Sequence, residues 1–433
     1  MGHMPNPDRE YRLLQQRLDR NIVGAPDSPE FTKILKMLFT PEEADLARRL
    51  PTAFAPLNRL SRQLGIPLDE LDDKMSALAS KGLVIDIESD GERYFSLSPV
   101  VIGFFEFTLM RTGEELPMKE LAGLFETYMD CNDRFARSAF EGQTQIGRAL
   151  VREETLPANY SEVLDWERAS SIIKSAPVIS LALCQCRHKA KHLGKACDAP
   201  ERACLAFNFA AEYLIRHGFA QQITNREAMR VLGECKEAGL AQICDNVQRN
   251  VTYICNCCGC CCEMLTAIKT FNLPGGVVTS NWIMQVNDEK CTGCGRCAAV
   301  CPLQAIEMVD AGQGREKFRR PVLEQSACLG CGVCHTACKS GAIIMKSRPK
   351  RVITPETAFD RVVSMAVERG KLTNILFENP EKLSHRALGR IIGILEKSSP
   401  FKAAMAIQPL KSVFLKGIVQ GAKWKLGKIG KIL

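Results

Sequence analysis

The chain has 433 residues, 21 of them cysteine, and a formal net charge of +8. This length allows roughly two to four domains with hydrophobic cores of their own. No apolar run is long enough for a spanning helix and no signal peptide is recognisable, so neither a membrane-spanning nor a secreted protein is expected. Cysteines in such numbers favour a reducing cytoplasm, where thiolates bind metal and do not form disulfides.

Residues 30–100 predict a small domain of helices followed by a strand hairpin. The order is helix, helix, strand, strand, over residues 57–64, 68–81, 83–87 and 93–97. This order resembles a winged-helix domain. The candidate recognition helix opens with acidic side chains, which would face DNA phosphates (Asp69, Glu70, Asp72 and Asp73). We therefore expect a packing or docking module, and DNA is not an expected ligand.

Residues 101–160 have apolar side chains at helical spacing and predict a helical linker region. A cysteine-rich middle domain of mixed α/β structure is expected over residues 161–282. It holds ten clustered cysteines, at Cys184, Cys186, Cys197, Cys204, Cys255, Cys257, Cys258, Cys260, Cys261 and Cys262. We expect residues 178–183 to form a buried strand that leads to the first pair, and Cys204 to open a helix. Cys235 and Cys244 are expected in the core, and Cys131 as a structural thiol.

Ten thiols are too many for one tetrahedral zinc ion, which takes four ligands and would leave the others incidental. Iron–sulfur chemistry can use between four and ten of them, in one or two cubanes or a less ordinary cluster. Neighbouring side chains diverge, so the dense run from Cys257 to Cys262 cannot aim at one ion, and at least two of its thiols point elsewhere. Arg187 could bind the cofactor by offsetting thiolate charge, although a surface role is equally open.

Residues 283–347 contain two blocks with the spacing C-x2-C-x2-C-x3-C. Three thiolates two residues apart can surround one face of an iron–sulfur cube, and glycines between them let backbone amides approach its sulfurs. Zinc and disulfides fit this doubled pattern less well. The stretch resembles a bacterial two-cluster ferredoxin, with Lys339 at a non-ligand position that usually holds proline. The resemblance implies two [4Fe–4S] clusters, one on Cys291, Cys294, Cys297 and Cys338, the other on Cys328, Cys331, Cys334 and Cys301.

Residues 348–433 predict a helical, basic C-terminal region. From Lys346 onward there are 18 Lys or Arg against 6 Asp or Glu, a net charge of +12. Within residues 401–433, lysines interleave with aliphatic residues and Trp424 in an amphipathic pattern. Such a helix can lie on a membrane surface, dock on a partner, or pack on its own domain. A peripheral position at the inner membrane face is therefore one of the alternatives for this protein.

The whole order of cysteine motifs, from C-x-C-R at Cys184 through C-N-C-C-x-C-C-C to the two ferredoxin blocks, resembles 4Fe–4S binding proteins of anaerobic bacteria that often start with a winged-helix-like region. The resemblance covers residues 30–350 and implies an α+β multidomain protein. The leading hypothesis is an electron carrier with two ferredoxin clusters and at least one further Fe–S cluster in the middle domain. The alternatives are a reductase with a catalytic middle cluster and a redox-responsive DNA-binding regulator.

No P-loop and no G-x-G-x-x-G fingerprint follows a strand, so neither ATP nor NAD(P)H is expected as a direct ligand. Electrons must then come from a protein partner, such as a flavoprotein, a ferredoxin or a reductase subunit. The sequence identifies no catalytic residue and leaves a homo-oligomer open.

Overall fold

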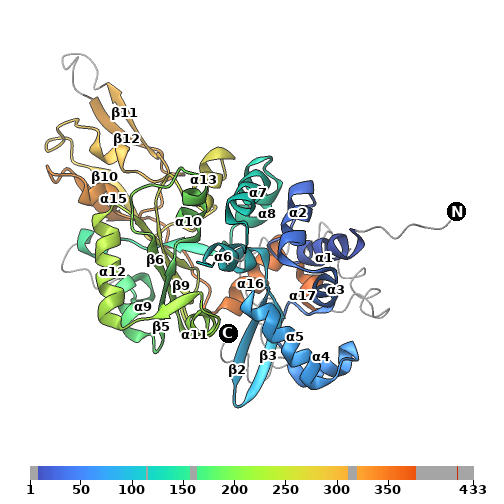
Figure 1. Ribbon diagram of the computed structural model, residues 1–433. Coiled ribbons are helices and arrows are strands. Elements are labelled where there is room, and N and C mark those ends of the chain that lie inside the picture. Colours follow the sequence, from blue (N-terminus) through green and yellow to red (C-terminus); the bar gives the residue numbers. More distant parts are fainter. Residues whose placement is uncertain (1–7, 114–115, 157–162, 311–318, 377–416, 418–433) are drawn as a thin grey trace. The chain divides into compact units, whose positions relative to one another are not determined.

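The structure, a computed structural model, describes residues 8–113, 116–156, 163–310, 319–376 and 417. It mixes α-helices and β-strands, as expected (Figure 1). The chain forms two compact units, one of residues 1–144, 216–219 and 357–433, the other of residues 145–215 and 220–356. The second unit contains all the cysteines of the middle and ferredoxin regions. The predicted amphipathic segment 401–433 lies outside the described residues, apart from Gly417.

The first unit is mainly helical. Its helices are α1 (Arg9–Asp19), α2 (Pro29–Leu38), α3 (Pro41–Arg49), α4 (Leu57–Leu64), α5 (Leu68–Ser80), α6 (Phe105–Leu109), α7 (Met118–Asp130), α8 (Arg134–Phe140), α16 (Ala358–Glu368) and α17 (Leu372–Leu376). A core of aromatic rings holds α2, α6 and α7 together, with Phe31 stacked on Tyr128 at 4.9 Å between ring centroids. Glu368 of α16 accepts a hydrogen bond from the backbone N–H of Thr144 at 2.7 Å, which fastens the C-terminal part to this unit.

The predicted order of helix, helix, strand, strand is present in the first unit. A three-stranded antiparallel sheet, with order β1-β3-β2, follows α4 and α5; its strands are β1 (Ala55–Pro56), β2 (Val84–Ser89) and β3 (Glu92–Leu97). Two of the acids at the start of α5 are paired within the unit, Glu70 with Lys74 at 2.6 Å and Asp72 with Arg93 at 2.5 Å. Glu70 and Asp72 therefore form ion pairs within the domain itself. The assignment of residues 30–100 as a winged-helix domain stays a prediction.

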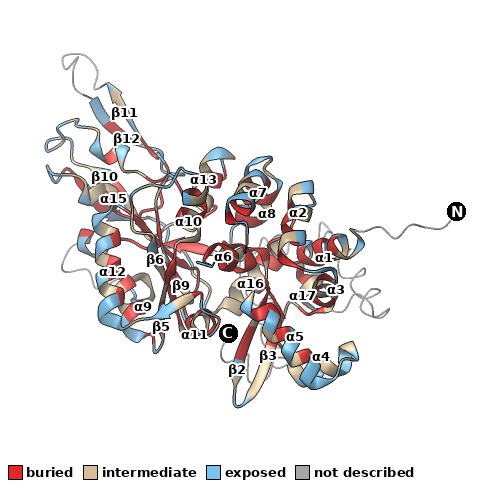
Figure 2. Cartoon of the chain, viewed as in Figure 1, coloured by how far each residue is buried: buried red, intermediate tan, exposed pale blue. Residues whose placement is uncertain are grey.

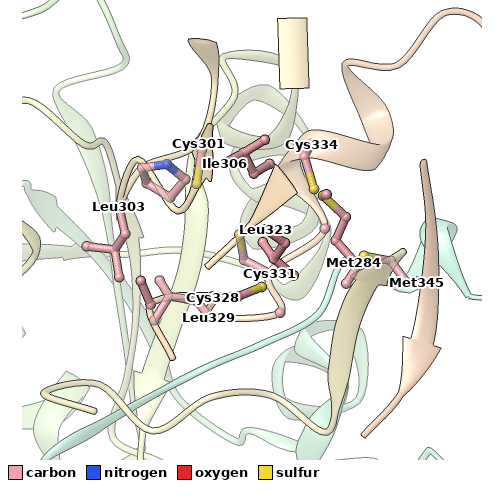
Figure 3. A pocket seen from close by; sticks show the side chains of 14 residues that line it. Met284, Cys301, Leu303, Ile306, Leu323, Cys328, Leu329, Cys331, Cys334 and Met345 are labelled. Atoms are coloured by element: carbon pink, nitrogen blue, oxygen red, sulfur yellow. The ribbon is translucent and has the colours of Figure 1, made fainter. Parts of the chain in front are cut away.

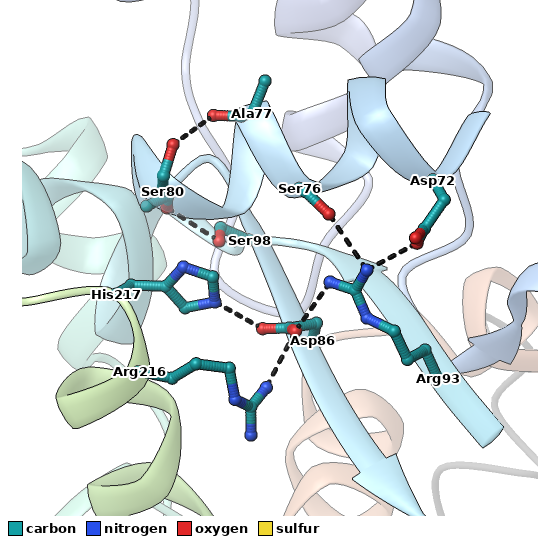
Figure 4. Close-up of polar contacts among 10 residues, drawn as sticks. Asp72, Ser76, Ala77, Ser80, Asp86, Arg93, Ser98, Arg216 and His217 are labelled. Carbon is teal, nitrogen blue, oxygen red and sulfur yellow. Dashed lines mark hydrogen bonds and ion pairs between the residues drawn. The ribbon is translucent and has the colours of Figure 1, made fainter. Parts of the chain in front are cut away.

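Asp86 of β2 is a deeply buried charge of the first unit that contacts two arginines and a histidine. It is 1% exposed and contacts Arg93, Arg216 and His217 at 3.1, 2.8 and 2.7 Å (Figure 4). Burial alone would raise the pKa of Asp86, but hydrogen bonds from His217 and Arg93 and the charge of Arg216 outweigh it and lower the pKa to about 2. Residues 216–219 are held in the first unit by this network.

The second unit is built on a six-stranded antiparallel sheet with order β4-β8-β9-β6-β5-β7. Its strands are β4 (Gly147–Ala149), β5 (Ile179–Leu183), β6 (Arg202–Phe207), β7 (Ala220–Gln222), β8 (Ala241–Asp245) and β9 (Tyr253–Cys257). The helices of this part are α9 (Ala169–Ser175), α10 (Gln185–His192), α11 (Asn208–Arg216), α12 (Asn225–Glu237) and α13 (Glu263–Thr270). The central strands are largely buried (Figure 2), because apolar residues occupy both faces.

The ferredoxin region adds two small antiparallel pairs to the same unit. β10 (Trp282–Val286) pairs with β13 (Ile343–Ser347), and β11 (Ile306–Asp310) pairs with β12 (Arg319–Leu323). The sequence pattern predicts only the second pair, over residues 305–308 and 321–324. One-turn helices α14 (Arg296–Ala299) and α15 (Val333–Thr336) carry part of the cysteine blocks. Among the described residues, no helix is both long and apolar enough to span a bilayer.

Two local predictions need correction. Cys204 does not open a helix: it lies within strand β6, and the helix begins four residues later at Asn208. The apolar run up to Phe207 is explained by its central place in the sheet, which buries both faces of β6. Cys131 is not packed as a structural thiol, because it is exposed at the C-terminal end of α7.

Candidate metal centres

The second ferredoxin block lines a cavity in the second unit. Thiols of Cys301, Cys328, Cys331 and Cys334 face it together, although Cys301 comes from the first block (Figure 3). The walls are apolar and come from β10, β11, β12 and β13 and the loops beside them, with Met284, Leu303, Ile306, Leu323 and Met345. These four thiols are the ligand grouping that the ferredoxin resemblance implies.

Burial disfavours ionisation of three thiols of the cavity, those of Cys301, Cys331 and Cys334. Desolvation raises the pKa of Cys301 and Cys334, and it raises that of Cys331 to about 12. A metal centre here must therefore displace protons as it binds, which couples its affinity to pH.

A glycine permits the close approach of the cavity loop to the strand β10. Gly330 has a φ of +69°, and a Cβ built on it would lie 2.0 Å from the carbonyl oxygen of Trp282. Ser280 contributes to the same junction by donating from its hydroxyl to the carbonyl of Gly330 at 2.7 Å. The glycine of C-L-G-C is thus required both for its backbone conformation and for space.

The first ferredoxin block is more accessible. Cys294 is exposed, Cys291 is half-buried and Cys297 is buried at the start of α14. The backbone N–H of Arg296, and then its guanidinium, lower the pKa of Cys294. Cys338 packs against the same hydrophobic cluster as Cys297, and so do Cys301 and Cys334, so thiols of both blocks surround one core.

Six of the ten middle-domain cysteines form one group, which we call the six-thiol group: Cys184, Cys186, Cys204, Cys255, Cys257 and Cys262. Cys257 and Cys262 are buried and the other four are half-buried. Their side chains contact one another in a chain of S–H···S hydrogen bonds. The sulfur of Cys255 accepts hydrogen bonds from Cys204 and Cys257, which lower the pKa of Cys255. The sulfur of Cys262 accepts hydrogen bonds from Cys186 and Cys257, which lower the pKa of Cys262. The donors Cys186 and Cys257 have raised pKa values for the same reason.

The sheet explains why these thiols converge. Cys255 and Cys257 are two residues apart on β9, and alternation along the strand therefore sends both side chains to the same face. Cys204 lies on β6, the neighbour of β9, beside a bulge where the pairing with β5 shifts at Leu183. Bulges redirect side chains, and this one lies next to the six-thiol group.

Two helices of eight residues begin at this group. Cys184 is the N-cap of α10 and Cys262 is the N-cap of α13, so the positive ends of both helix dipoles face the thiols. Lys189 of α10 and Glu263 of α13 form a salt bridge of 2.6 Å with side chains 6% and 10% exposed. This buried pair fixes the two helices to each other directly behind the group.

The other four cysteines form a second group, which we call the four-thiol group: Cys197, Cys258, Cys260 and Cys261. All four sulfurs lie within 4.8 Å of one another. The dense run is therefore divided, with Cys257 and Cys262 in one group and the residues between them in the other. Burial raises the pKa of Cys258, but the backbone N–H of Cys261 and the charge of Arg187 outweigh it and lower the pKa to about 7.

Arg187 lies between the two groups and is 2% exposed. Its guanidinium donates to the backbone carbonyls of Pro200 and Asn256, and it interacts with thiols of both groups, Cys184 in one and Cys258 in the other. A buried cation at this place offsets thiolate charge on either side. The sequence motif predicts that Arg187 offsets thiolate charge, but only the fold places this side chain beside both groups.

The ferredoxin cavity and the six-thiol group share one hydrophobic core. Cys257 and Cys262 pack in the same cluster as Cys331, together with Leu303, Leu329 and Val333 of the ferredoxin region and Ile243, Leu265 and Ile268 of the middle region. Arg152 strengthens this junction: its backbone N–H donates to the carbonyl of Cys331 at 3.1 Å. Metal centres at the two places would thus be separated by packed apolar side chains.

Comparison with known proteins agrees with these cysteine patterns. A sequence model of the 4Fe-4S dicluster domain matches residues 290–342, and one of the LdpA Fe-S cluster-binding domain matches residues 266–312. The chain is a 4Fe–4S binding protein. Its cofactors are iron–sulfur clusters, and such clusters give it a redox role. No curated protein and no solved structure matched the chain.

Some residues near the centres were not singled out from the sequence. Lys189 and Glu263 are far apart along the chain, and only the packing of α10 on α13 brings them together. Gly259 is in the cysteine run, yet its contact with the backbone of Pro302, beside Cys301, appears only in the fold. Cys235 and Cys244 are fully buried in the core, as expected, and burial raises both pKa values to about 12.

Proposed function

We propose that this protein carries electrons between two [4Fe–4S] clusters in residues 283–347 and a further Fe–S cluster on the six-thiol group. One observation carries the proposal: Cys331 of the ferredoxin region and Cys257 and Cys262 of the six-thiol group line a single hydrophobic core. Short apolar separations between buried centres suit electron transfer, since little solvent reorganises around them. The first block, with its exposed Cys294, would then be the entry or exit point.

Metal counting on the full chain tests this proposal. Two cubanes supply about eight irons, so anaerobically purified and reconstituted protein should contain clearly more, with matching acid-labile sulfide. Cys255→Ala should remove only the iron in excess of these eight atoms. Cys331→Ala should lower the iron content of the ferredoxin clusters. Cys131→Ala, at an exposed thiol of the other unit, is the matched control. About eight irons in the wild type, or an unchanged count in Cys255→Ala, would contradict the third cluster.

A reductase is the second candidate function, because six touching thiols exceed the four that a cubane needs. An unusual cluster with an open iron could bind a substrate. Cyanide added to the reduced chain should then change the electron paramagnetic resonance signal that Cys255→Ala removes. If cyanide left this signal unchanged, the middle cluster would have no open iron and would act only as an electron carrier.

For the partner we propose an acidic redox protein that meets the first ferredoxin block. Arg296 beside Cys294 is exposed, and so are Arg319 and Arg320 on β12. Opposite charges speed association at low ionic strength and are screened by salt. Reduction of the wild-type chain by an acidic ferredoxin should slow as the salt concentration rises, and it should slow more steeply than reduction of the Arg320→Gln variant.

The sequence also supports a cytoplasmic setting, with residues 401–433 on a membrane surface or a partner helix.

A further inference from the structure

The four-thiol group is the one cysteine cluster of the described residues in which four sulfurs are all close to one another. The sulfurs of Cys197 and Cys258 are 3.7 Å apart, those of Cys260 and Cys261 are 3.7 Å apart, and all four lie within 4.8 Å of one another. Among the described residues, these are the only His, Cys, Asp or Glu side chains grouped so tightly. The eight ferredoxin cysteines do not reach this spacing.

This spacing is that of a single tetrahedral ion. Four sulfurs that each lie about 2.3 Å from zinc are roughly 3.8 Å from one another, by the geometry of a tetrahedron. In a cubane each thiolate binds a different iron, and the four sulfurs spread over a larger tetrahedron. The eight ferredoxin thiols, where cubanes are implied, are more widely spaced, and the thiols of the six-thiol group contact one another only in a chain; all four thiols of the four-thiol group are mutually close.

The surroundings of the four-thiol group support a closed, single-ion site. The backbone N–H of Cys261 donates to the sulfur of Cys258 at 3.4 Å, an interaction that orients a thiolate ligand. Lys269 donates to the carbonyl of Gly259 and so holds the turn between Cys258 and Cys260. Arg187 lies beside Cys197 and Cys258 and offsets the net charge of about −2 that four thiolates leave on a divalent ion.

We propose that Cys197, Cys258, Cys260 and Cys261 bind one Zn²⁺ ion in a tetrahedral site, apart from the iron–sulfur clusters. Thiolates in this geometry suit zinc, and zinc exceeds ferrous iron in affinity for such ligands. With four protein ligands no position is left for a substrate, so the ion is structural. It ties the loop that carries Cys197 to the turn after β9, directly against Pro302 of the ferredoxin region.

Elemental analysis of the full chain, purified without oxygen, tests the site. About one zinc per chain is expected in the wild type. Cys197→Ala and Cys260→Ala should each lose this zinc while iron and acid-labile sulfide stay unchanged. Cys131→Ala should retain it, and Cys255→Ala should lose iron while it keeps zinc. This last variant separates a failure of the zinc site from a failure of the cluster proposed for the six-thiol group.

X-ray absorption at the zinc edge gives a second measurement that needs no variant, in case the substituted chains fail to fold. Wild-type protein should show four sulfur neighbours at about 2.3 Å and no nitrogen or oxygen ligand. The proposal is overturned if the wild type holds no zinc, if nitrogen or oxygen ligands appear, or if Cys260→Ala loses iron and sulfide together.

Discussion

At the scale of single residues, Gly259 is a point where the middle and ferredoxin regions come very close. A Cβ at this position would lie 2.6 Å from the carbonyl oxygen and 2.9 Å from the Cα of Pro302, and neither is a flexible side-chain end. Gly259→Ala must push the two loops apart, so it should destabilise the second unit by about 1–3 kcal/mol. It should also slow electron transfer between the two regions, because Pro302 adjoins Cys301.

Denaturant unfolding and rapid-freeze spectroscopy of the reduced chain measure these two effects. Gly233→Ala is the matched control, because that glycine lies in α12 and a Cβ added there would meet no atom beyond its own helix backbone. Alanine favours a helix by about 1 kcal/mol over glycine, so the control should be neutral or more stable. Equal stability and equal electron-transfer rates in the two variants would show that the loop of Pro302 moves away from the added methyl group at no cost.

Asp86 predicts a pH dependence for the first unit. Its pKa lies at about 2, below the ordinary 3.8, so its stabilisation is present above about pH 4 and is lost as pH falls towards 2. The difference corresponds to about 2 kcal/mol. Asp86→Asn should lower stability at neutral pH by at least this amount and flatten the acid limb of a stability–pH curve. Glu88→Gln, on an exposed position of the same strand, should change neither.

At the scale of elements, the junction of α10 with α13 depends on a buried charge pair. Lys189→Met leaves the buried Glu263 carboxylate beside Cys262 without a cation and with only the hydrogen bond from Gln185, which should cost about 3–5 kcal/mol. The matched control is Lys191→Met on the same helix, whose partner is Glu201 and whose side chain is 63% exposed. That exposed pair should contribute less than about 1 kcal/mol. Thermal unfolding of the loaded chains distinguishes the two, and similar losses would contradict the buried pair's role.

The loop of the second ferredoxin block gives another prediction at this scale. Gly330→Ala would place a methyl group 2.0 Å from the carbonyl of Trp282 and should prevent the loop from closing on β10. We expect loss of about four irons per chain, one cubane. Gly341→Ala has a similar φ, +65°, but open space around its side chain, so it isolates the effect of the clash. Retention of full iron by Gly330→Ala would show that the strand β10 moves away.

At the scale of the whole molecule, metal binding should hide almost every thiol. Cys235 and Cys244 are buried with pKa values raised to about 12, and Cys131 is exposed. A thiol reagent added to the loaded chain should therefore react rapidly at one site, which Cys131→Ala abolishes. After chelation and denaturation, all 21 thiols should react. Several fast thiols in the loaded wild type would mean that some of the clustered cysteines hold no metal.

The ferredoxin region could be foreseen from the sequence in most respects, because its ligands follow a fixed local spacing. The pairing of β11 with β12 and the place of Cys301 beside the second block agree with that pattern, whereas the pairing of β10 with β13 was not foreseen. The helices and strands of residues 57–97 and the strand that leads to Cys184 were also foreseen, since caps and periodicity are local properties. Many other elements of both units, including α10, α13 and β8 beside the thiol groups, were not. Cys204 was misplaced because a buried strand and a buried helix have similar apolar composition.

The sequence by itself determined that iron–sulfur chemistry would dominate this protein, since the number and spacing of thiols are written along the chain. Only the tertiary structure decided how the ten middle-domain cysteines divide into six and four. That division depends on which strands lie side by side, on the alternation along β9, and on the loop that returns Cys197 to Cys258. Such contacts join residues up to 78 positions apart, as Gln185 and Glu263 show, and no local pattern encodes them.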